Sequence, residues 1–303
     1  MTAMSGPVTG WRANATTIGA VPHYDYTTVG HVTIDVLANG ARRPGGTALY
    51  SALQAARLGL RTLILTRGVL DEIEQLLEPH RHELDLQVLP AEHTTTLQTV
   101  GEGLARHQRL LAWAGPIQGA IEGPIEIDTA ILHIAPVARE TPRAWSGHAA
   151  FVGLTPQGLV REWVAAGDIA LSPLPPELLP ERCDAWVLSE RERECCAEPA
   201  ARAAAASAVV AVTAGAHPVV LQLPGGELQH VPVPPIAAPV EDLGAGDVFA
   251  AAFFIALHEG LPPTRAAAFA NAAAAVRIAG VGPGAIGNRR AITARERESP
   301  ARL

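Results

Sequence analysis

The sequence has few cysteines and no long apolar stretch. Only three of its 303 residues are cysteines, and Cys195 and Cys196 are adjacent, which leaves Cys183 without an obvious partner for a bridge. No apolar run reaches the roughly eighteen residues of a membrane-spanning helix, and residues 1–20 lack the continuous apolar core of a signal peptide. These absences exclude a disulfide-stapled secreted domain and an integral membrane protein, and they predict a location in the cytosol.

The sequence also lacks an excess of positive charge and a metal-ligating pattern. Its formal net charge is -7, which argues against nucleic acid as a partner. His80, His82 and His93 lie close together in the sequence, but no cysteine or carboxylate around them has the spacing of a zinc site. No Gly-x-Gly-x-x-Gly motif follows the first predicted strand, so a dinucleotide-binding oxidoreductase is only a remote alternative.

The most informative segment that is present is the glycine turn formed by Gly244, Ala245 and Gly246. It leads directly into the apolar run Val248 to Leu257, which has the length of a buried helix. The first N–H groups of a helix have no intrahelical partners, and together with the helix dipole they favour an anion. Glycine permits the tight turn and lets a phosphate approach the backbone. The turn therefore predicts an anion hole.

Asp247 adds a carboxylate beside this predicted anion hole. A carboxylate and a phosphate repel each other, so this residue type favours a base that accepts a proton from an attacking hydroxyl. The combination is the chemistry of a small-molecule kinase. An aspartate near the start of a helix is also an ordinary structural feature, so these four residues alone leave both interpretations open.

A second glycine pair, Gly45-Gly46, precedes a predicted helix that ends before Gly59. Upstream, residues 27–35 alternate like a strand that ends on Asp35, and residues 61–66 form a short run that favours a strand. The order strand, aspartate, glycine pair, helix and strand predicts a βαβ unit. Its strand end and glycine pair can face a polyol ligand.

With both segments in place, the sequence resembles the PfkB, or ribokinase-like, carbohydrate kinase family over residues 29–287. That family pairs an N-terminal strand ending in Asp and a Gly-Gly helix with a C-terminal Asp-Thr-x-Gly-Ala-Gly-Asp signature. The resemblance implies that Asp247 is the base and that the amides of residues 244–246 form the anion hole. It also implies that Asp35 and the pair Gly45-Gly46 hold hydroxyl groups of the substrate.

Weaker matches extend the resemblance to a nucleotide site, and they imply ATP as the donor and Mg²⁺ as the metal. The Val-Thr-Ala-Gly segment with Thr213 and Gly215 resembles the family's Val-Thr-x-Gly nucleotide loop. Ser189 and Glu192 stand at the ends of the family's Asn-x-x-Glu motif, where Glu192 would organise a water-bound magnesium ion. Asn271 resembles a residue of the family's late helix near the nucleotide.

Several positions depart from the family pattern. Glu241 and Asp242 stand where the family has Asp-Thr, so a carboxylate replaces a hydroxyl near the phosphates and bears on metal handling. Thr33 and Tyr50 stand where ribokinases have asparagines that grip a furanose, which assigns both to the substrate site and disfavours ribose. Arg109 can supply positive charge to a substrate, although a surface ion pair is the commoner role of an isolated arginine.

The segment before the glycine pair and the loop at residues 280–287 bear on the lid, the substrate and the monovalent cation. Only residues 36–44 separate Asp35 from the glycine pair, whereas many family members insert lid strands there, so a small or minimal lid is predicted. The reduced lid and Ser189 are similar to the plant myo-inositol kinase branch, which favours a cyclic polyol or an unusual sugar. A small lid also favours a monomer, or a homodimer built elsewhere. Binding of K⁺ near residues 280–287 stays open.

The whole chain is predicted to be one α/β domain of the ribokinase-like class, with a mostly parallel central sheet flanked by helices. Residues 1–24 are interpreted as a loose tail, residues 25–290 as the kinase domain and residues 291–303 as a C-terminal tail. Short apolar runs with the character of buried parallel strands occur at residues 130–135, 149–154, 185–189 and 208–213.

Three functional interpretations follow. The favoured one is a kinase that moves the γ-phosphate of ATP to a hydroxyl of a sugar or cyclic polyol, with a nucleoside as an alternative acceptor. The second is a catalytically impaired regulator that binds a nucleotide or sugar on the same fold. It is favoured by the departures at Ser189, at Glu241-Asp242 and at Pro218, which replaces the glycine that often ends the family's nucleotide loop. The presence of Asp247 and its anion hole favours the enzyme, because catalysis requires these parts most. The oxidoreductase remains the third.

Overall fold

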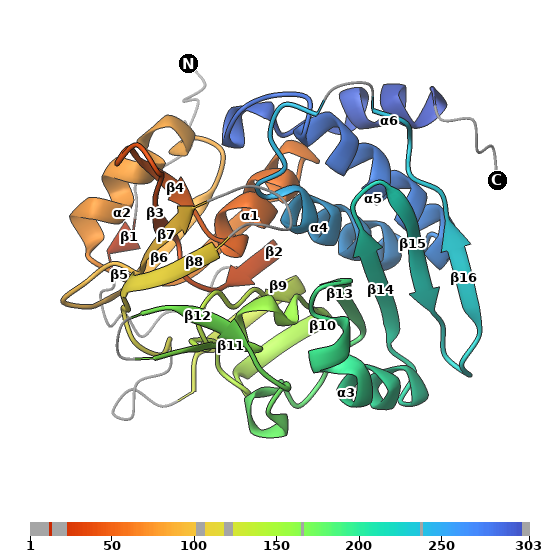
Figure 1. The fold of residues 1–303 in the computed structure, drawn as a ribbon, viewed down its shortest axis with the longest axis horizontal. Coiled ribbons are helices and arrows are strands. Elements are labelled where there is room, and N and C mark those ends of the chain that lie inside the picture. The colour runs from red at the N-terminus through yellow and green to blue at the C-terminus, as the bar shows by residue number, and fades with distance from the viewer. Residues whose placement is uncertain are drawn as a thin grey trace, which may run out of the picture.

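The structure, a computed structural model, describes residues 12–13, 23–100, 107–117, 124–164, 167–236 and 239–298. Its centre is a ten-stranded sheet in the order β1-β6-β5-β2-β9-β10-β13-β14-β15-β16 (Figure 1). The strands are β1 (Arg12–Ala13), β2 (Tyr24–Val29), β5 (Thr62–Gly68), β6 (Asp85–Pro90), β9 (Glu126–Ile134), β10 (Ser146–Leu154), β13 (Ala185–Ser189), β14 (Val209–Ala214), β15 (His217–Gln222) and β16 (Leu228–Val231). Neighbours from β1 to β14 are parallel, and β14 to β16 are antiparallel. The predicted mostly parallel sheet is confirmed.

The direction in which strands are added reverses between β2 and β9. From β2 the chain passes outward through β5 to β6, and it then returns to the other side of β2 for β9, β10, β13 and β14. In open parallel sheets, ligands bind outside the carboxyl ends of the strands at such a reversal. The fold therefore points to the loops that follow β2, β9, β10 and β13.

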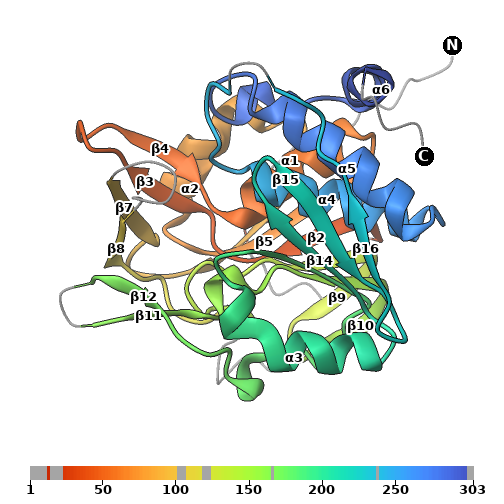
Figure 2. The same ribbon diagram turned by 45° about the vertical axis from the view of Figure 1, so that its right-hand side comes forward.

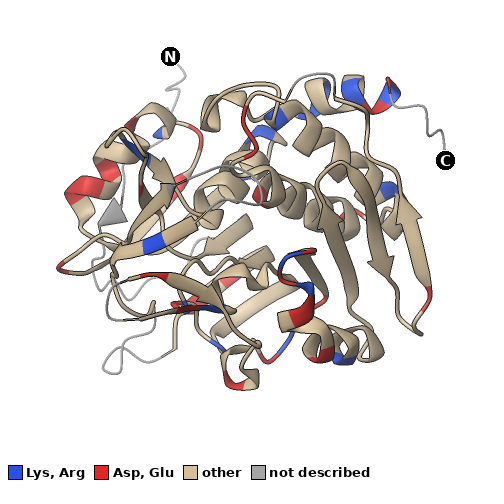
Figure 3. Cartoon of the chain, in the orientation of Figure 1, with Lys and Arg blue, Asp and Glu red and all other residues tan. Residues whose placement is uncertain are grey.

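The four apolar runs in the middle of the chain form β9, β10, β13 and β14, as predicted. Their side chains alternate between two hydrophobic cores, since Ile131 of β9 belongs to one core and Leu132 to the other. In β13, Val187 and Trp186 divide in the same way. Burial on both faces explains why these strands read as apolar runs and carry few charges (Figure 3).

Helices cover both faces of the sheet (Figures 1 and 2). The helices are α1 (Thr47–Arg57), α2 (Leu70–Leu77), α3 (Arg193–Ala205), α4 (Ala245–His258), α5 (Pro263–Arg277) and α6 (Arg289–Arg297). All except α3 contribute side chains to the first core, and α3 covers the second core through Cys196, Ala200 and Ala204. The central element of the first core is α4, which lies between α1 and α5.

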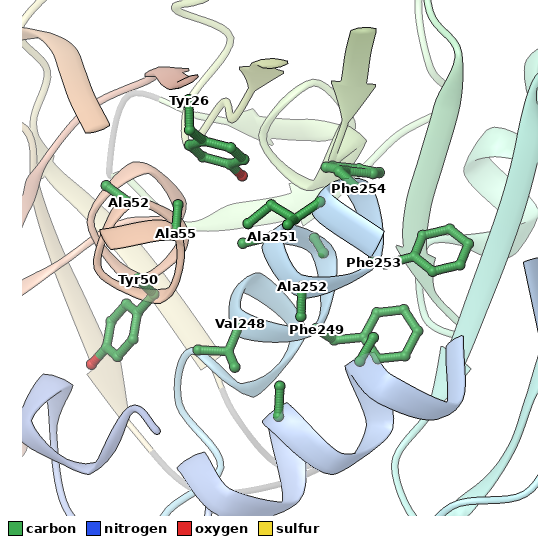
Figure 4. Packing of buried hydrophobic residues seen from close by; sticks show 14 of the residues in the cluster. Tyr26, Tyr50, Ala52, Ala55, Val248, Phe249, Ala251, Ala252, Phe253 and Phe254 are labelled. Carbon is green, nitrogen blue, oxygen red and sulfur yellow. The ribbon is translucent and has the colours of Figure 1, made fainter. Parts of the chain in front are cut away.

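Small side chains allow α1 and α4 to pack closely. Ala55 of α1 and Ala251 of α4 have no exposed surface, and the phenylalanines of α4 lie on the side away from α1 (Figure 4). A larger side chain at such a contact costs about 1–3 kcal/mol through overpacking. This packing fixes the N-terminus of α4, where the glycine turn and Asp247 lie.

A second sheet of four strands forms a lid, in the order β4-β3-β7-β8. Its strands are β3 (Thr33–Val36), β4 (Arg42–Gly45), β7 (Thr96–Val100) and β8 (His107–Ala112). A hairpin of β11 (Arg161–Trp163) and β12 (Ile169–Leu171) lies beside β8, where Arg109 and Asp168 form a β-bridge (Figure 2). The lid and this hairpin occupy the same end of the molecule.

One expectation about the start of the lid is wrong. Residues 27–35 do not form one strand, because the chain leaves the main sheet after β2 and enters the lid as β3. The short segment 36–44 contains most of β4. The turn between β3 and β4 is built on Asn39-Gly40, with Gly40 at φ 80°, and this dipeptide is a strong hairpin signal. The lid is still small, since β3 and β4 have 4 residues each.

The predicted domain limits of 25 and 290 stay predictions. Most of the predicted N-terminal tail, and residues 299–303, lie outside the described residues. Residues 291–297 belong to α6, whose Ile292 is buried in the first core. Within the described ranges, no helix combines the length and the apolar character needed to cross a membrane.

Candidate active site

Most of the candidate residues gather beyond the carboxyl ends of the parallel strands. Asp35 follows β2, Ser189 ends β13, and Glu192 is the N-cap residue of α3, which follows β13. Asp247, in the first turn of α4, interacts electrostatically with both Asp35 and Glu192. The N-terminus of α4 therefore meets the edge of the sheet where the strand order reverses, as expected for a ligand site in this fold.

Gly244 must be glycine for two reasons. Its φ of 77° lies in the left-handed region, which glycine adopts without strain. A Cβ at this position would also collide with the ring of Tyr50. Tyr50, assigned to the substrate site from the sequence, therefore packs behind the glycine turn with 1% of its surface exposed.

The glycine turn leaves two amides at the start of α4. The Ala245 amide donates to the Asp242 carbonyl at 3.1 Å, which closes the turn. The amides of Gly246 and Asp247 follow, before the first i→i−4 bonds of the helix and at the positive end of its dipole. A Cβ on Gly246 would meet no heavy atom within 4 Å, so the space in front of this turn is open. These two amides are the best placed to bind an anion.

The side chain of Asp247 is oriented by α1. Thr47 donates a side-chain hydrogen bond to its carboxylate, and Ser51 Oγ donates to the Asp247 carbonyl at 3.2 Å. Both hydroxyls lie on the first turns of α1, immediately after the glycine pair at residues 45–46. The close packing of α1 on α4 therefore also fixes the position of the candidate base.

Burial raises the pKa of Asp247 from 3.8 to about 6. The hydrogen bond from Thr47 and the charge of Arg161 act in the opposite direction, whereas the charges of Glu192 and Asp35 raise the pKa further. A carboxylate with this pKa is mostly ionised at pH 7 and is more basic than an exposed aspartate. Both properties suit a general base.

Arg161 brings a buried guanidinium to the same group of carboxylates. Its Nη1 donates to the Val137 carbonyl and its Nη2 to Gln108 Oε1, both at 2.9 Å, so β8 of the lid holds it in place. Its charge interacts with those of Glu192 and Asp247, and more weakly with two further carboxylates. The sequence contains no lysine, so every fixed side-chain cation in this site must come from an arginine.

The structure brings Thr33, Asp35 and Gly45 together. Thr33 Oγ1 donates to Asp35 Oδ1 at 2.8 Å, and Thr33 and Gly45 are partners in the β3–β4 register. A Cβ at Gly45 would collide with the Asp35 carboxylate, so glycine is needed there for space. Asp35 is 7% exposed and is well suited to accept hydrogen bonds from substrate hydroxyls.

Gly46 and Glu140 hold the loops at the reversal point. A Cβ at Gly46, which has φ 96°, would collide with the His31 carbonyl. The His31 amide donates to Glu140 Oε1 at 2.9 Å, and Glu140 also accepts from the amides of Val137 and Ala138. One buried carboxylate thus joins the loop after β2 to the loop after β9. Its charge-assisted bonds stabilise this edge of the site.

The candidate nucleotide residues lie at the ends of β13 and β14. Ser189 and Thr213 are register partners, and the Ser189 amide donates to Glu192 Oε2 at 2.7 Å. Gly215 has φ 60° and open space around it. Among the described residues, no three His, Cys, Asp or Glu side chains are grouped as metal ligands. The carboxylate of Glu192 is an oxygen donor of the kind that magnesium accepts when most of its other ligands are water and phosphate oxygens.

Two predicted site residues have partners outside this group. Asn271 of α5 is 4% exposed, and its Nδ2 donates to the Pro232 carbonyl at 3.1 Å, which fastens the segment after β16. Arg109 is on the lid strand β8, where its Nε lies 3.1 Å from Asp168 Oδ1 and its side chain is 42% exposed.

Thr47, Glu140 and Arg161 are site residues that the sequence motifs do not indicate. Thr47 follows the glycine pair directly, and a hydroxyl at a helix start is a recognisable signal. Glu140 and Arg161 follow the predicted strands that end at residues 135 and 154. Polar residues in loops after consecutive apolar strands could have been grouped as neighbours, because parallel strands share one carboxyl edge.

Comparisons with known proteins agree with this geometry. Residues 173–288 match the family model described as pfkB family carbohydrate kinase. This region runs from before β13 to the end of the loop after α5, and it includes Ser189, Glu192, the glycine turn and Asp247. No curated protein matches the chain.

Solved structures show the same fold over nearly the whole chain. Ribokinase from Arabidopsis thaliana, in complex with ribose and ATP, has a TM-score of 0.68 and 18% identity, covering 91% of this chain and 99% of that one. Ribokinase from Thermotoga maritima has a TM-score of 0.68 and 20% identity, with coverage of 90% and 99%. A pyrophosphate-dependent kinase of the ribokinase family, in complex with a pyrophosphate analogue and myo-inositol, has a TM-score of 0.67 and 21% identity, with coverage of 89% and 99%.

Residues 173–288 identify a pfkB-type carbohydrate kinase domain in this chain, and the fold is ribokinase-like. This kinase is a phosphotransferase that acts on sugar or polyol hydroxyl groups, as the family match and the fold indicate. The predicted family and fold class are confirmed. The similarity to the plant myo-inositol kinase branch stays a prediction.

Proposed function

We propose that this kinase transfers the γ-phosphate of ATP to a hydroxyl of a cyclic polyol or sugar, with Asp247 as the general base. The placement of Asp247 carries the proposal. Its carboxylate has a pKa raised to about 6, and it lies in the first turn of α4 beside the open amides of the glycine turn. A base and an anion site in one turn are what phosphoryl transfer to an alcohol needs.

The acceptor is held by the lid side of the site. Asp35, oriented by Thr33, accepts hydrogen bonds from substrate hydroxyls, and the glycine pair at residues 45–46 leaves room for the ring. Asp247 takes the proton of the reacting hydroxyl while the oxygen of that hydroxyl forms a bond to the γ-phosphorus. The bond from that phosphorus to the β,γ-bridging oxygen breaks, ADP leaves, and the proton remains on the carboxyl until it passes to solvent.

The transferred phosphoryl group is stabilised by backbone amides at the N-terminus of α4 and by one arginine side chain. The amides of Gly246 and Asp247 point their N–H dipoles at it, which is the usual source of a large electrostatic term in catalysis. Arg161 contributes a full positive charge on the side of the carboxylates. The charge of Arg161 also favours the ionised form of Asp247, because it lowers the pKa of Asp247 whereas burial raises it.

The donor lies along the ends of β13 and β14. Ser189, Thr213 and the open turn at Gly215 are proposed to contact the nucleotide, and Asn271 supports that region by holding the segment after β16. Glu192 would hold Mg²⁺ through water. When bound, magnesium neutralises charge on the phosphate oxygens.

The favoured acceptor class is a cyclic polyol. Thr33 is engaged with Asp35, and Tyr50 packs behind the glycine turn, so neither occupies the furanose-gripping role that the family's asparagines have. One similar structure is described with myo-inositol and a pyrophosphate analogue, which adds pyrophosphate as a second candidate donor. A cytosolic location and a monomeric or homodimeric assembly are proposed on sequence grounds alone.

The test is a matrix of two donors and four acceptor classes. ATP and pyrophosphate are each offered with magnesium to inositols, pentoses, hexoses and nucleosides, and the phosphorylated product is detected directly. The wild type is compared with Asp247→Asn. One donor and one acceptor that react with the wild type alone establish both the reaction and the base.

Two other results would revise the proposal. Product formation with pyrophosphate alone replaces ATP as the donor and leaves the role of Asp247 intact. No product with any pair, while ATP still raises the unfolding temperature of the protein, shows instead a nucleotide-binding regulator on a kinase fold. Equal turnover of the wild type and Asp247→Asn rejects the assignment of the base.

A further inference from the structure

Arg277 is the largest side chain that is fully buried among the described residues. It ends α5, where the negative end of the helix dipole favours a cation. Its Nη1 donates to the Gly280 carbonyl at 3.0 Å, and its Nη2 donates to Glu241 Oε2 at 2.7 Å. Its guanidinium carbon also lies 5.4 Å from the centre of the Tyr50 ring, in cation–π range.

Glu241 is the centre of this network. Its carboxylate accepts from Arg277, from Arg43 and from the Gly282 amide, the last at 2.7 Å. Burial alone would raise the pKa of Glu241, but these three donors lower it below its ordinary value, so the group is ionised. One negative and two positive side chains leave the cluster with a net positive charge.

The network joins the segment that enters the proposed anion hole to two neighbouring parts of the chain. Glu241 precedes the glycine turn, Gly280 and Gly282 belong to the loop after α5, and Arg43 belongs to lid strand β4. The amide of Val240 adds a hydrogen bond of 2.7 Å to the Ile278 carbonyl. Arg277 therefore fixes the loop after α5 to the segment that enters the turn.

We propose that the Arg277 guanidinium is a resident cation that takes the place of a monovalent metal ion in the loop at residues 280–287, so that this kinase needs no K⁺. A metal ion there would draw on carboxylate and carbonyl oxygens. The Glu241 carboxylate and the Gly280 carbonyl provide such oxygens, and both already accept hydrogen bonds from Arg277. A further cation would also meet the net positive charge of the cluster. The residues therefore do not fit a bound K⁺.

The first test needs only the wild type. Its unfolding temperature is compared in potassium chloride and in choline chloride at equal ionic strength, and its phosphoryl-transfer rate is measured in the same two salts. The unfolding temperatures should agree within about 1 °C, since a salt that does not bind the native state does not stabilise it. The rates should agree within about twofold, a difference of only about 0.4 kcal/mol in activation free energy.

Two results overturn the proposal. One is a stabilisation of several degrees that is specific to K⁺ over choline. The other is an activity that requires K⁺. Only the rate rests on the proposed function: if no acceptor reacts in either salt, the unfolding temperatures still decide the cation question.

Variants of Arg277 sharpen the test. Arg277→Ala empties the space between Glu241 and Gly280 and leaves a cavity lined by oxygens, so its unfolding temperature is expected to rise in potassium chloride relative to choline chloride. Arg289→Ala is the matched control, because Arg289 is 46% exposed in its ion pair with Glu259, and it should show no such salt preference. If Arg277→Ala is as stable and as active as the wild type in choline chloride, the resident-cation role is rejected.

Arg277→Lys keeps the charge and should retain independence from K⁺ even if the alanine variant does not fold.

Discussion

Glu241 and Asp247 stand on either side of the same glycine turn, in opposite electrostatic surroundings. The hydrogen bonds that reach Glu241 outweigh its burial and lower its pKa. Asp247 has a hydrogen bond from Thr47 and the field of Arg161, but burial dominates and raises its pKa to about 6. The Glu241 carboxylate is held in its charged form by its donors, and Asp247 can exchange a proton near neutral pH.

The difference shows how one short segment serves two purposes. The charged carboxylate acts as a structural anchor, because a buried ion pair that is well satisfied fixes the position of the chains that it joins. The second carboxylate has few compensating donors, so its ionised form is less stable and more basic. Replacing each carboxylate by its amide should therefore damage different properties of the protein.

The largest effect is expected for Asp247→Asn. Loss of the general base should lower kcat by about 10²- to 10⁴-fold, measured with the best acceptor from the donor and acceptor screen. Because its folded-state pKa of about 6 lies above 3.8, Asp247 contributes less to stability as the pH rises through this range. The asparagine variant should therefore be at least as stable as the wild type at pH 7. Asp71→Asn, the same change at an exposed position of α2, should leave kcat unchanged.

Glu241→Gln should instead destabilise the protein, by about 3–5 kcal/mol, because it leaves Arg277 buried without its counter-charge. Urea unfolding at pH 7 measures this loss. Glu259→Gln breaks an ion pair whose partners are 37% and 46% exposed, and it should cost less than about 1 kcal/mol. Similar losses for both variants would show that the Glu241 cluster is not an anchor.

Gly246→Ala tests the anion hole without disturbing either carboxylate. A Cβ at this position meets no protein atom, so the unfolding temperature should not change. The methyl group would lie in the space proposed for the phosphoryl group, and kcat should fall by about 10²-fold, the usual effect of losing one oxyanion donor. Gly284→Ala, where a Cβ also meets no atom, is the control and should keep full activity. Full activity in Gly246→Ala would place the phosphate elsewhere.

The smallest effect concerns the pH dependence of the rate. In the wild type, kcat should rise with pH to a plateau, with an apparent pKa of about 6 that belongs to Asp247. Arg161→Met removes a charge that lowers this pKa, so the profile should move to higher pH by about one unit. Arg202→Met changes an exposed arginine of α3, whose side chain is 72% exposed, and should leave the profile unchanged. A profile that does not move in Arg161→Met rejects its influence on the base.

The main-sheet strands could be predicted from the sequence because burial on both faces requires continuous apolar runs. A different criterion, the alternation of polar and apolar residues, failed at the start of the lid. Alternation over residues 27–35 suggests one strand, but a pattern of polar and apolar residues does not reveal that β2 and β3 belong to different sheets. The Asn39-Gly40 hairpin signal was present and would have indicated β4.

The sequence by itself determined the glycine turn, the candidate base and the glycine pair, because each depends on residues that are adjacent in the chain. Tertiary structure alone decided the position of Arg161, the partners of Glu241 and the burial of Arg277. These groups come from segments separated by tens to hundreds of residues in the printed sequence. A charge acts through distance and burial, and neither is fixed until the sheet and its helices have packed.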